Sequence, residues 1–174
     1  MTAMRVIFTD RLALVPLSHE LMRWRMRRDD FRLHVPGLGL VTFPPTWPGD
    51  ALAMFPSFLS SRGDSVPDSY VAINRGEFVA VGQLGATGDV GEGGAIEIGY
   101  GFGMPGRGYA TEAVAALVAH LLARTSISTV TASTAVDNVA SQRVLEKNGF
   151  RQVGTGWSEG DGDLKLWSRG SVVE

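Results

Sequence analysis

The chain has no cysteine among its 174 residues. Disulfides, cysteine–zinc sites and thiol nucleophiles are therefore excluded, and the composition fits a cytoplasmic protein. Long apolar runs are also missing. None approaches the roughly 20 residues that span a bilayer, and we expect no membrane association and no signal peptide in the opening MTAMRVIFTDR. A basic excess is absent too: the net charge of −2 argues against nucleic acid as a partner.

The motifs of several enzyme classes are missing as well. The three histidines show no metal-ligand spacing, and the chain lacks both a Gly-x-Ser-x-Gly turn and a Ser/His/Asp set. We therefore expect neither a metal site nor a hydrolase. The 44% hydrophobic and 20% charged residues are those of an ordinary globular protein, and the length predicts a single domain over residues 1–174.

The most informative stretch is residues 95–113, AIEIGYGFGMPGRGYATEA. An apolar strand runs into a glycine-dense turn, and the turn opens a helix. Glycine lets a backbone approach a ligand closely, and the first helical turn offers N–H groups without intrahelical partners at the positive end of the helix dipole. This arrangement predicts a site for a phosphorylated ligand.

One interpretation of this stretch is a dinucleotide site. Gly101, Gly103 and Gly106 fit the G-x-G-x-x-G fingerprint. That fingerprint also expects an acidic residue about 20 positions later, at the end of the next strand. Here that position falls near Thr125, before the next strand begins, and Asp137 comes too late. An NAD-binding oxidoreductase is the alternative with the weaker support.

The second interpretation comes from a resemblance. Residues 106–113, GRGYATEA, resemble the acetyl-CoA pyrophosphate loop of the GCN5-related N-acetyltransferases, the GNAT superfamily. Residues 9–17, TDRLALVPL, look like the opening strand of its RimJ/RimL-like branch, and residues 137–150, DNVASQRVLEKNGF, are similar to that branch's cofactor-side helix. The three motifs occur in the family's order and span most of the chain. The resemblance implies transfer of an acetyl group from acetyl-CoA to a primary amine.

The expected fold is α/β, in the order β α α β β β α β α β β. It has a mixed, mostly antiparallel central sheet of about seven strands with helices on both faces, and the resemblance implies a splay between the fourth and fifth strands. Hydrophobic periodicity and caps predict helices over residues 18–28, 107–124 and 138–148.

The regions between these elements carry further expectations. In the first helix, Leu21, Met22 and Trp24 should be buried, with its arginines on a solvated face. Residues 29–49, with four prolines in VPGLGLVTFPPTWPG, predict an irregular loop, and residues 50–62 predict a short helix interrupted by a proline. A hairpin is expected across residues 74–77, with Gly76 able to take positive φ.

The resemblance also implies where coenzyme A binds. Its pantetheine arm would pair with the strand edge, its diphosphate would lie on the N–H groups that open the helix, and polar residues of the 138–148 helix would face the arm. The implied cofactor-binding residues are Tyr100, Gly101, Phe102, Gly103, Met104, Gly106, Arg107, Gly108, Tyr109, Ala110, Thr111, Asn138, Ser141 and Arg143. Arg107 as a plain surface residue and Asn138 as a helix cap are the open alternatives.

Glu97 is the expected general base, because a carboxylate can take the proton of an acceptor ammonium. It alternates with Ile96 and Ile98 and therefore points to the opposite face of the strand; an ion-paired or solvated position is the alternative. Ser141 is the second expected catalytic residue, assisting the thiolate. The resemblance implies that Phe43 and Trp47 lie near the acceptor pocket; the alternative is that they are aromatic side chains tucked under a surface loop.

Three departures from the family's pattern motivate another hypothesis. Leu145 stands where many relatives carry a tyrosine, Pro105 occupies the first fixed position of the phosphate loop, and the turn before Gly106 is short. A non-catalytic acyl-CoA sensor would accommodate them. The sequence does not specify the acceptor, which would be a small-molecule or peptide primary amine, and homodimers are common in the resembling branch.

Overall fold

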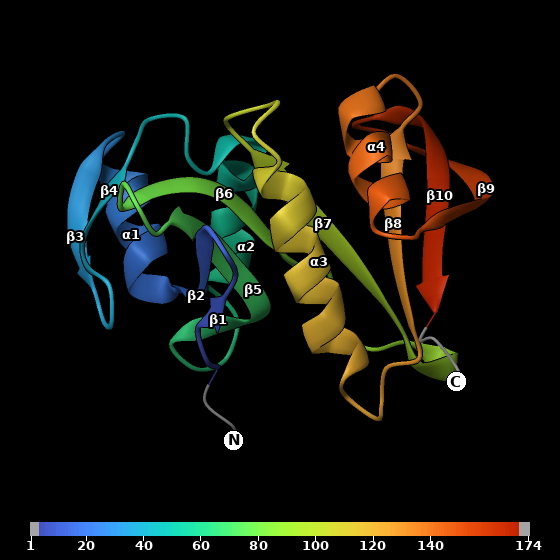
Figure 1. The fold of residues 1–174 in the computed structure, drawn as a ribbon, viewed down its shortest axis with the longest axis horizontal. Coiled ribbons are helices and arrows are strands. Elements are labelled where there is room, and N and C mark those ends of the chain that lie inside the picture. Colours follow the sequence, from blue (N-terminus) through green and yellow to red (C-terminus); the bar gives the residue numbers. More distant parts are fainter. Residues whose placement is uncertain (1–3, 171–174) are drawn as a thin grey trace. The chain divides into compact units, whose positions relative to one another are not determined.

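The computed structural model describes residues 4–170 and divides into two compact units (Figure 1). Unit 1 comprises Met1–Gly85 with Tyr100–Ala113, and unit 2 comprises Ala86–Gly99 with Val114–Glu174. Three elements contribute residues to both units: the strands β6 (Val79–Ala86) and β7 (Ala95–Phe102) and the helix α3 (Tyr109–Leu122).

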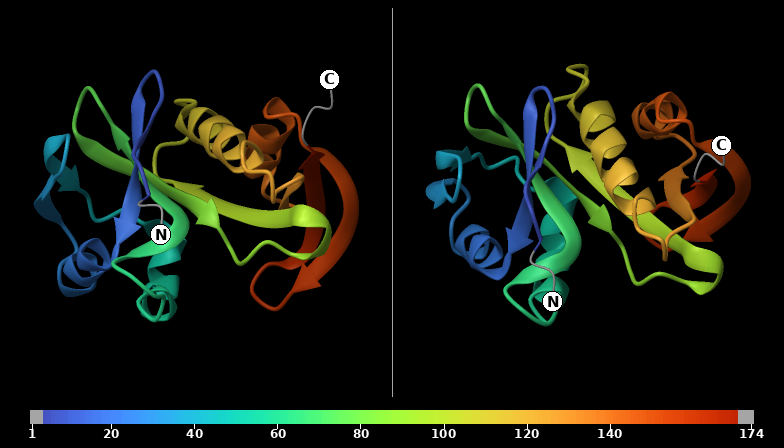
Figure 2. Two further views of the ribbon diagram at one scale, coloured as in Figure 1. Left: turned by 90° about the horizontal axis from the view of Figure 1, so that it is seen from below. Right: turned by 60° about the horizontal axis from the view of Figure 1, so that its bottom comes forward.

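Unit 1 combines short helices with antiparallel strands. Its elements are β1 (Ile7–Phe8), β2 (Leu12–Ser18), α1 (His19–Arg27), β3 (Phe31–Val35), β4 (Gly39–Phe43), the 3-10 helix η1 (Gly49–Met54), α2 (Phe55–Phe58), β5 (Ser65–Asn74) and β6 (Val79–Ala86). The strands run in the order β1-β2-β5-β6. Figure 2 shows β1 folded back on β2, so the single strand expected at this end of the chain is a hairpin.

The helix α1 begins as predicted and differs in what it buries. The Ser18 hydroxyl accepts the Leu21 N–H at 3.1 Å, which satisfies one of the donors that a helix start leaves open. Leu21 and Met22 are buried, as expected. The prediction for Trp24 is wrong, because that ring stays 36% exposed.

Arg25 is the main correction in α1, because it is buried rather than solvated. Its Nε donates to the Trp47 carbonyl at 2.7 Å and its Nη2 to the Pro45 carbonyl at 3.3 Å. Asp29 lies 3.4 Å from its Nη1. The guanidinium thus satisfies carbonyls of a proline-rich segment, and removal of such a buried partner is strongly destabilising.

The loop expected over residues 29–49 is largely a hairpin, and that prediction is wrong. β3 and β4 pair antiparallel with Phe31 opposite Phe43 and Val35 opposite Gly39. The turn between them contains Gly37 at φ 83°, a conformation that glycine adopts without steric cost. The prolines lie in the turn and after β4, and none of them interrupts either strand.

The next two elements also differ from expectation. The helix expected over residues 50–62 is shorter, formed by η1 and the single turn α2, with Pro56 in the first turn of α2. In the β5–β6 turn the left-handed residue is Phe78, at φ 55°, and not Gly76. The Asn74 side chain accepts the N–H groups of Gly76 and Glu77 at 2.8 and 3.0 Å, which fixes the turn in this form.

Unit 2 contains η2 (Glu92–Gly94), β8 (Thr129–Ala135), α4 (Val139–Lys147), β9 (Arg151–Ser158) and β10 (Gly162–Gly170). Its strands run in the order β7-β8-β10-β9. β10 pairs antiparallel with both β8 and β9, so the last two strands of the expected order form a hairpin. The apolar stripe of α3 is confirmed, since Val114, Leu117, Val118 and Leu121 are fully buried.

The expected sheet is confirmed in its pairing pattern. Ten strands lie in residues 4–170, and apart from β1, β3 and β4 they are the seven expected ones. The fourth and fifth of these, β7 and β8, are parallel, with a register of three pairs from Ala95–Thr129 to Glu97–Thr131. Within the same residues no helix is both long and apolar enough to cross a membrane.

Candidate active site

The register of β7 decides where its backbone N–H groups point. The Gly103 N–H donates to the Val81 carbonyl at 3.1 Å, and the Thr87 N–H donates to the Glu97 carbonyl at 2.9 Å, in one continuous antiparallel register with β6. Backbone groups of successive strand residues face opposite edges. The N–H of Gly101 therefore faces β6, and the N–H of Phe102 faces the other edge.

The side chains of β7 alternate in the same way. Ile96 and Ile98 are buried on one face, and Glu97 is exposed on the other, as the alternation predicts. Glycines follow Glu97 on its face of the strand at positions 99, 101 and 103. A side chain at Gly101 would meet nothing within 4 Å, so the backbone is open to approach there.

The turn between β7 and α3 contains two glycines in the left-handed conformation. Gly106 and Gly108 have φ values of 80° and 75°, which other residues adopt only with strain. The Glu112 N–H donates to the Gly108 carbonyl at 3.1 Å, so helical bonding begins at Gly108. The N–H groups of Tyr109 and Ala110 belong to the first turn, where a helix has no internal acceptors to offer.

Arg11, from the turn before β2, is bound to this loop by a network that the sequence did not suggest. Its Nε donates to Glu112 Oε2 and its backbone N–H to Glu112 Oε1, each at 2.8 Å. The Thr9 hydroxyl donates to Oε1 at 2.9 Å. The Arg11 Nη1 donates to the Arg107 carbonyl at 2.7 Å. We call Thr9, Arg11, Arg107 and Glu112 the clasp.

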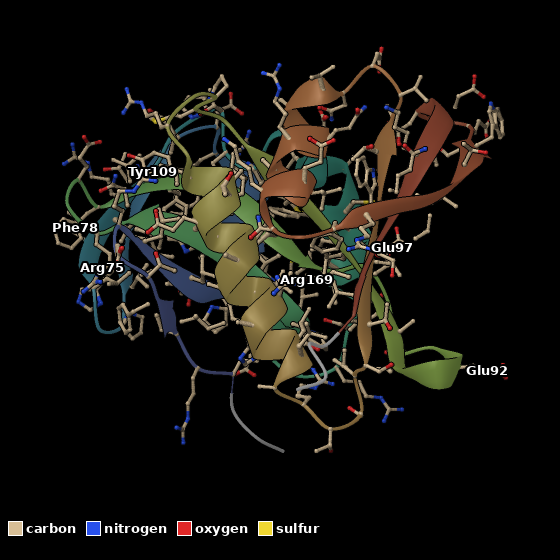
Figure 3. All side chains as sticks on the ribbon, turned by 45° about the vertical axis from the view of Figure 1, so that its right-hand side comes forward. Arg75, Phe78, Glu92, Glu97, Tyr109 and Arg169 are labelled. Carbon is tan, nitrogen blue, oxygen red and sulfur yellow. The ribbon has the colours of Figure 1, made fainter. Side chains whose placement is uncertain are left out.

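Tyr109 ties the clasp to the β5–β6 turn. The Arg11 guanidinium carbon lies 4.7 Å from the centre of the Tyr109 ring, a cation–π distance. The Asn74 amide donates to the Tyr109 hydroxyl at 2.7 Å. Figure 3 shows Tyr109 at the start of α3 and Arg75 beside Phe78 in the β5–β6 turn. The ring of Tyr109 is buried, so this residue of the predicted cofactor loop packs its side chain inside the protein.

The clasp sets the charge state of Glu112. Burial raises the pKa of this carboxyl, but the hydrogen bonds from the Arg11 N–H, the Thr9 hydroxyl and the Arg11 side chain, together with the Arg11 charge, outweigh that effect. The net result is a pKa below the ordinary value of 4.5. Glu112 is therefore an ionised structural residue, the role expected of an acid in a first helical turn.

This lowered pKa predicts a pH dependence of stability. Because the unfolded chain takes up the Glu112 proton at a higher pH than the folded one, the stabilisation is present above the ordinary pKa and is lost as pH falls through the folded one. In urea titrations, Glu112→Gln should be less stable than the unaltered chain by a constant margin from pH 7 to pH 5. The margin should shrink below about pH 4.5. A margin independent of pH down to pH 3 would contradict the assignment.

The expected site residues of unit 2 lie on β7 and α4. Asn138 caps α4 by accepting the Ser141 N–H at 3.2 Å, so the cap interpretation of Asn138 is confirmed. Ser141 is half-buried and Arg143 is exposed. Leu145, on the same helix, is fully buried and acts as a core residue. A role of Asn138, Ser141 or Arg143 toward a ligand stays a prediction.

Phe43 and Trp47 lie in the core of unit 1. The rings of Phe31 and Phe43 stack at 4.8 Å, and Trp47 meets Phe43 edge-on at 5.1 Å. This burial fits the alternative of tucked aromatic side chains, and a role at an acceptor pocket stays a prediction. Two buried polar atoms in the described part of unit 1 have no hydrogen-bond partner, Trp47 Nε1 and Gln83 Oε1.

The expected site residues thus fall into two groups. Those in unit 1 are Phe43, Trp47, Tyr100, Gly101, Phe102, Gly103, Met104, Gly106, Arg107, Gly108, Tyr109, Ala110 and Thr111; those in unit 2 are Glu97, Asn138, Ser141 and Arg143. Sequence reasoning missed Arg11, although its motif was noted, because no local pattern pairs a residue with one about a hundred positions away.

Comparison with known families identifies the family of the chain. The acetyltransferase (GNAT) domain model matches residues 11–151. The chain belongs to the GNAT acetyltransferase family. Within it, the chain is 35% identical over 111 residues to the uncharacterized N-acetyltransferase YjdG of Bacillus subtilis (strain 168). That alignment covers 60% of this chain and 66% of YjdG, just under two thirds of its length.

Solved GNAT structures share the fold at lower identity. A GNAT-family acetyltransferase from Bacillus anthracis has a TM-score of 0.66 at 20% identity, over 95% of this chain and 98% of that one. RimL, the ribosomal L7/L12 α-N-protein acetyltransferase, solved with coenzyme A, has a TM-score of 0.63 at 18% identity over the same shares. The aminoglycoside acetyltransferase AAC(6′)-Ib, also solved with coenzyme A, has 0.62 at 19% identity, over 92% of this chain and 95% of its own.

Proposed function

We propose that the protein transfers an acetyl group from acetyl-CoA to a primary amine by direct attack. The observation that carries the proposal is the loop of residues 106–112, where two left-handed glycines precede the first turn of α3. Membership of the acetyltransferase family and the coenzyme A bound to RimL and AAC(6′)-Ib support it.

The residues of the loop suit a diphosphate. Gly106 and Gly108 bring the backbone within reach of phosphate oxygens, and the N–H groups from Arg107 to Thr111 would hold them. A side chain at Gly106 would meet nothing within 4 Å, so this part of the turn is open to a ligand. When bound, acetyl-CoA supplies the thioester from which the acetyl group leaves.

The strand β7 would orient the reacting carbonyl. The Phe102 N–H points to the edge opposite β6, while that of Gly101 is turned toward β6. The same register turns the Tyr100 N–H to that edge, and the Phe102 N–H, next to the glycine turn, is the donor that we propose to stabilise the oxyanion. Preorganised donors of this kind are often the largest catalytic contribution.

Glu97 is the proposed general base. Its exposed carboxylate can take a proton from the acceptor ammonium, directly or through one water. Ser141 is proposed to donate a hydrogen bond to the departing thiolate. Because a CoA thiol leaves readily near neutral pH, the absence of a tyrosine at Leu145 does not prevent the reaction.

The acceptor is proposed to approach the face of β7 that carries Gly101. The register places Gln83 directly opposite Gly101, and opposite residues of paired strands share a face. The Gln83 Oε1 is buried and has no hydrogen-bond partner in the described residues, and it is proposed to accept an amine N–H when the acceptor binds against this face. An amine that carries further hydroxyl or amide groups fits this polar face better than an alkylamine does.

Gln83→Met tests this assignment, because it removes the buried, unpaired Oε1 and keeps a side chain of similar length. An unpaired buried polar group costs about 1–3 kcal/mol, so the free energy of unfolding should rise by about 1 kcal/mol. The KM for the acceptor should rise while the KM for acetyl-CoA stays the same. Urea titration and steady-state kinetics measure both. A loss of stability with an unchanged acceptor KM would contradict the assignment.

The transfer itself is tested by incubating the chain with acetyl-CoA and an amine panel and measuring free thiol. The panel comprises aminoglycosides, polyamines, amino acids and peptides with a free N-terminus. Turnover on any of them supports the enzyme. Tight coenzyme A binding without turnover on the whole panel would instead support the alternative, a non-catalytic acyl-CoA sensor.

A further inference from the structure

We propose that Arg11 is a positioning residue for the acyl donor: it aims the Gly108 N–H at the diphosphate and cancels the charge of Glu112. This inference rests on the proposed function, because it assigns a role within the same donor site. It concerns a residue about a hundred positions earlier in the chain, reached through contacts inside unit 1.

The first part of the inference follows from the peptide between Arg107 and Gly108. That peptide is planar and trans, so its C=O and N–H point in opposite directions. The Arg11 Nη1 holds the Arg107 carbonyl at 2.7 Å. The Gly108 N–H is therefore directed away from Arg11, outward from the clasp.

The second part follows from the charges. Glu112 lies in the first turn of α3, where the diphosphate is proposed to bind, and its low pKa keeps it ionised at neutral pH. An unpaired carboxylate at that place would repel a dianionic ligand. Arg11 neutralises it through two hydrogen bonds, one of them charge-assisted from Nε.

The geometry also requires both an arginine and a glycine. One guanidinium binds Glu112 and Arg107 at once, which a lysine ammonium on its flexible stem does not reproduce. A Cβ on Gly108 would lie 3.2 Å from Arg11 Nη2, so a side chain there would require the guanidinium to shift by a few tenths of an ångström. The contacts of the guanidinium thus favour an arginine at position 11 together with a glycine at position 108.

The test compares two ligands in ¹⁵N NMR titrations of the folded chain: coenzyme A and pantetheine, which lacks the diphosphate. For Arg11→Met we expect the Kd of coenzyme A to rise about tenfold or more, or roughly 1.4 kcal/mol, with the Kd of pantetheine unchanged. The shift of the Gly108 amide on coenzyme A binding should shrink. Arg75→Met is the matched control. The Arg75 Nη1 donates to the Thr9 carbonyl at 2.7 Å, in the turn that also contains Arg11, but in the part of the chain that the structure describes no hydrogen bond joins Arg75 to residues 106–112.

The outcomes separate this inference from the proposed function. If the Kd of coenzyme A is unchanged in Arg11→Met, or if the Kd values of coenzyme A and pantetheine rise equally, the role of Arg11 is overturned. The proposed function then still stands. If the unaltered chain binds coenzyme A no better than pantetheine, the diphosphate site itself is wrong and both fall.

Should Arg11→Met not fold, Arg11→Lys keeps the charge and removes the second donor. Arg11→Lys should raise the Kd of coenzyme A and leave the Kd of pantetheine unchanged. The additional change Glu112→Gln in either variant should restore part of the affinity, and no gain from it would contradict the charge argument.

Discussion

Gly108→Glu should weaken coenzyme A binding about 100-fold, or by roughly 2.7 kcal/mol, while the chain stays folded. Two effects combine. The new carboxylate would stand at the proposed diphosphate site, and the new Cβ would approach Arg11 Nη2 and disturb the clasp. Calorimetric titration with coenzyme A measures the loss. An unchanged affinity would mean that residues 106–112 do not hold the diphosphate.

A matched control separates ligand binding from backbone strain. At φ 75°, any side chain at Gly108 costs roughly 1–2 kcal/mol of stability. Gly37→Glu imposes the same strain and the same charge in the β3–β4 turn, where φ is 83° and a Cβ meets nothing within 4 Å. Both variants should have a lower Tm than the unaltered chain, and only Gly108→Glu should have a lower affinity for coenzyme A.

Glu97→Gln should lower kcat at pH 7 by about 100-fold, the lower end of what a general base contributes. The KM for acetyl-CoA should not change, because Gln keeps the shape of the side chain and Glu97 is not assigned to donor binding. The deficit should shrink as pH rises toward the pKa of the acceptor amine, since the free amine then needs no base. Thiol release across a pH series, with an acceptor identified from the amine panel, gives the profile.

Glu92→Gln is the corresponding control for charge. Glu92 is an exposed carboxylate of η2 that precedes β7 in unit 2, and Figure 3 labels both residues. The Glu92→Gln variant should retain full activity. If Glu97→Gln also stays within about twofold of the unaltered chain, solvent or another group removes the proton.

Periodic and capping signals predicted much of the fold. The apolar stripe of α3, the Ser18 cap and the Asn138 cap each depend on residues within a few positions of one another, so sequence alone contains the information. The alternation of Glu97 with Ile96 and Ile98 was readable for the same reason. The family resemblance added the order of strands, which local patterns do not determine.

The wrong predictions have different causes. The β3–β4 hairpin was hidden by its neighbouring prolines, although Phe31, Leu33 and Val35 alternate and Pro36-Gly37 is a turn signal. Arg25 was assigned to solvent because nothing near it in sequence shows the carbonyls of Pro45 and Trp47 that bury it. Phe78 takes the left-handed position because Asn74 fixes the turn through its side chain.

The clasp has a consequence for biosynthesis. Its hydrogen bonds join Thr9 and Arg11 to a residue more than 100 positions later, so the loop cannot reach its final form until the ribosome has released residue 112. Contacts that close so long a segment tend to form late and slowly. Nascent chains that end before α3 should therefore leave this arginine solvated, and donor binding should be acquired only after most of the polypeptide has emerged.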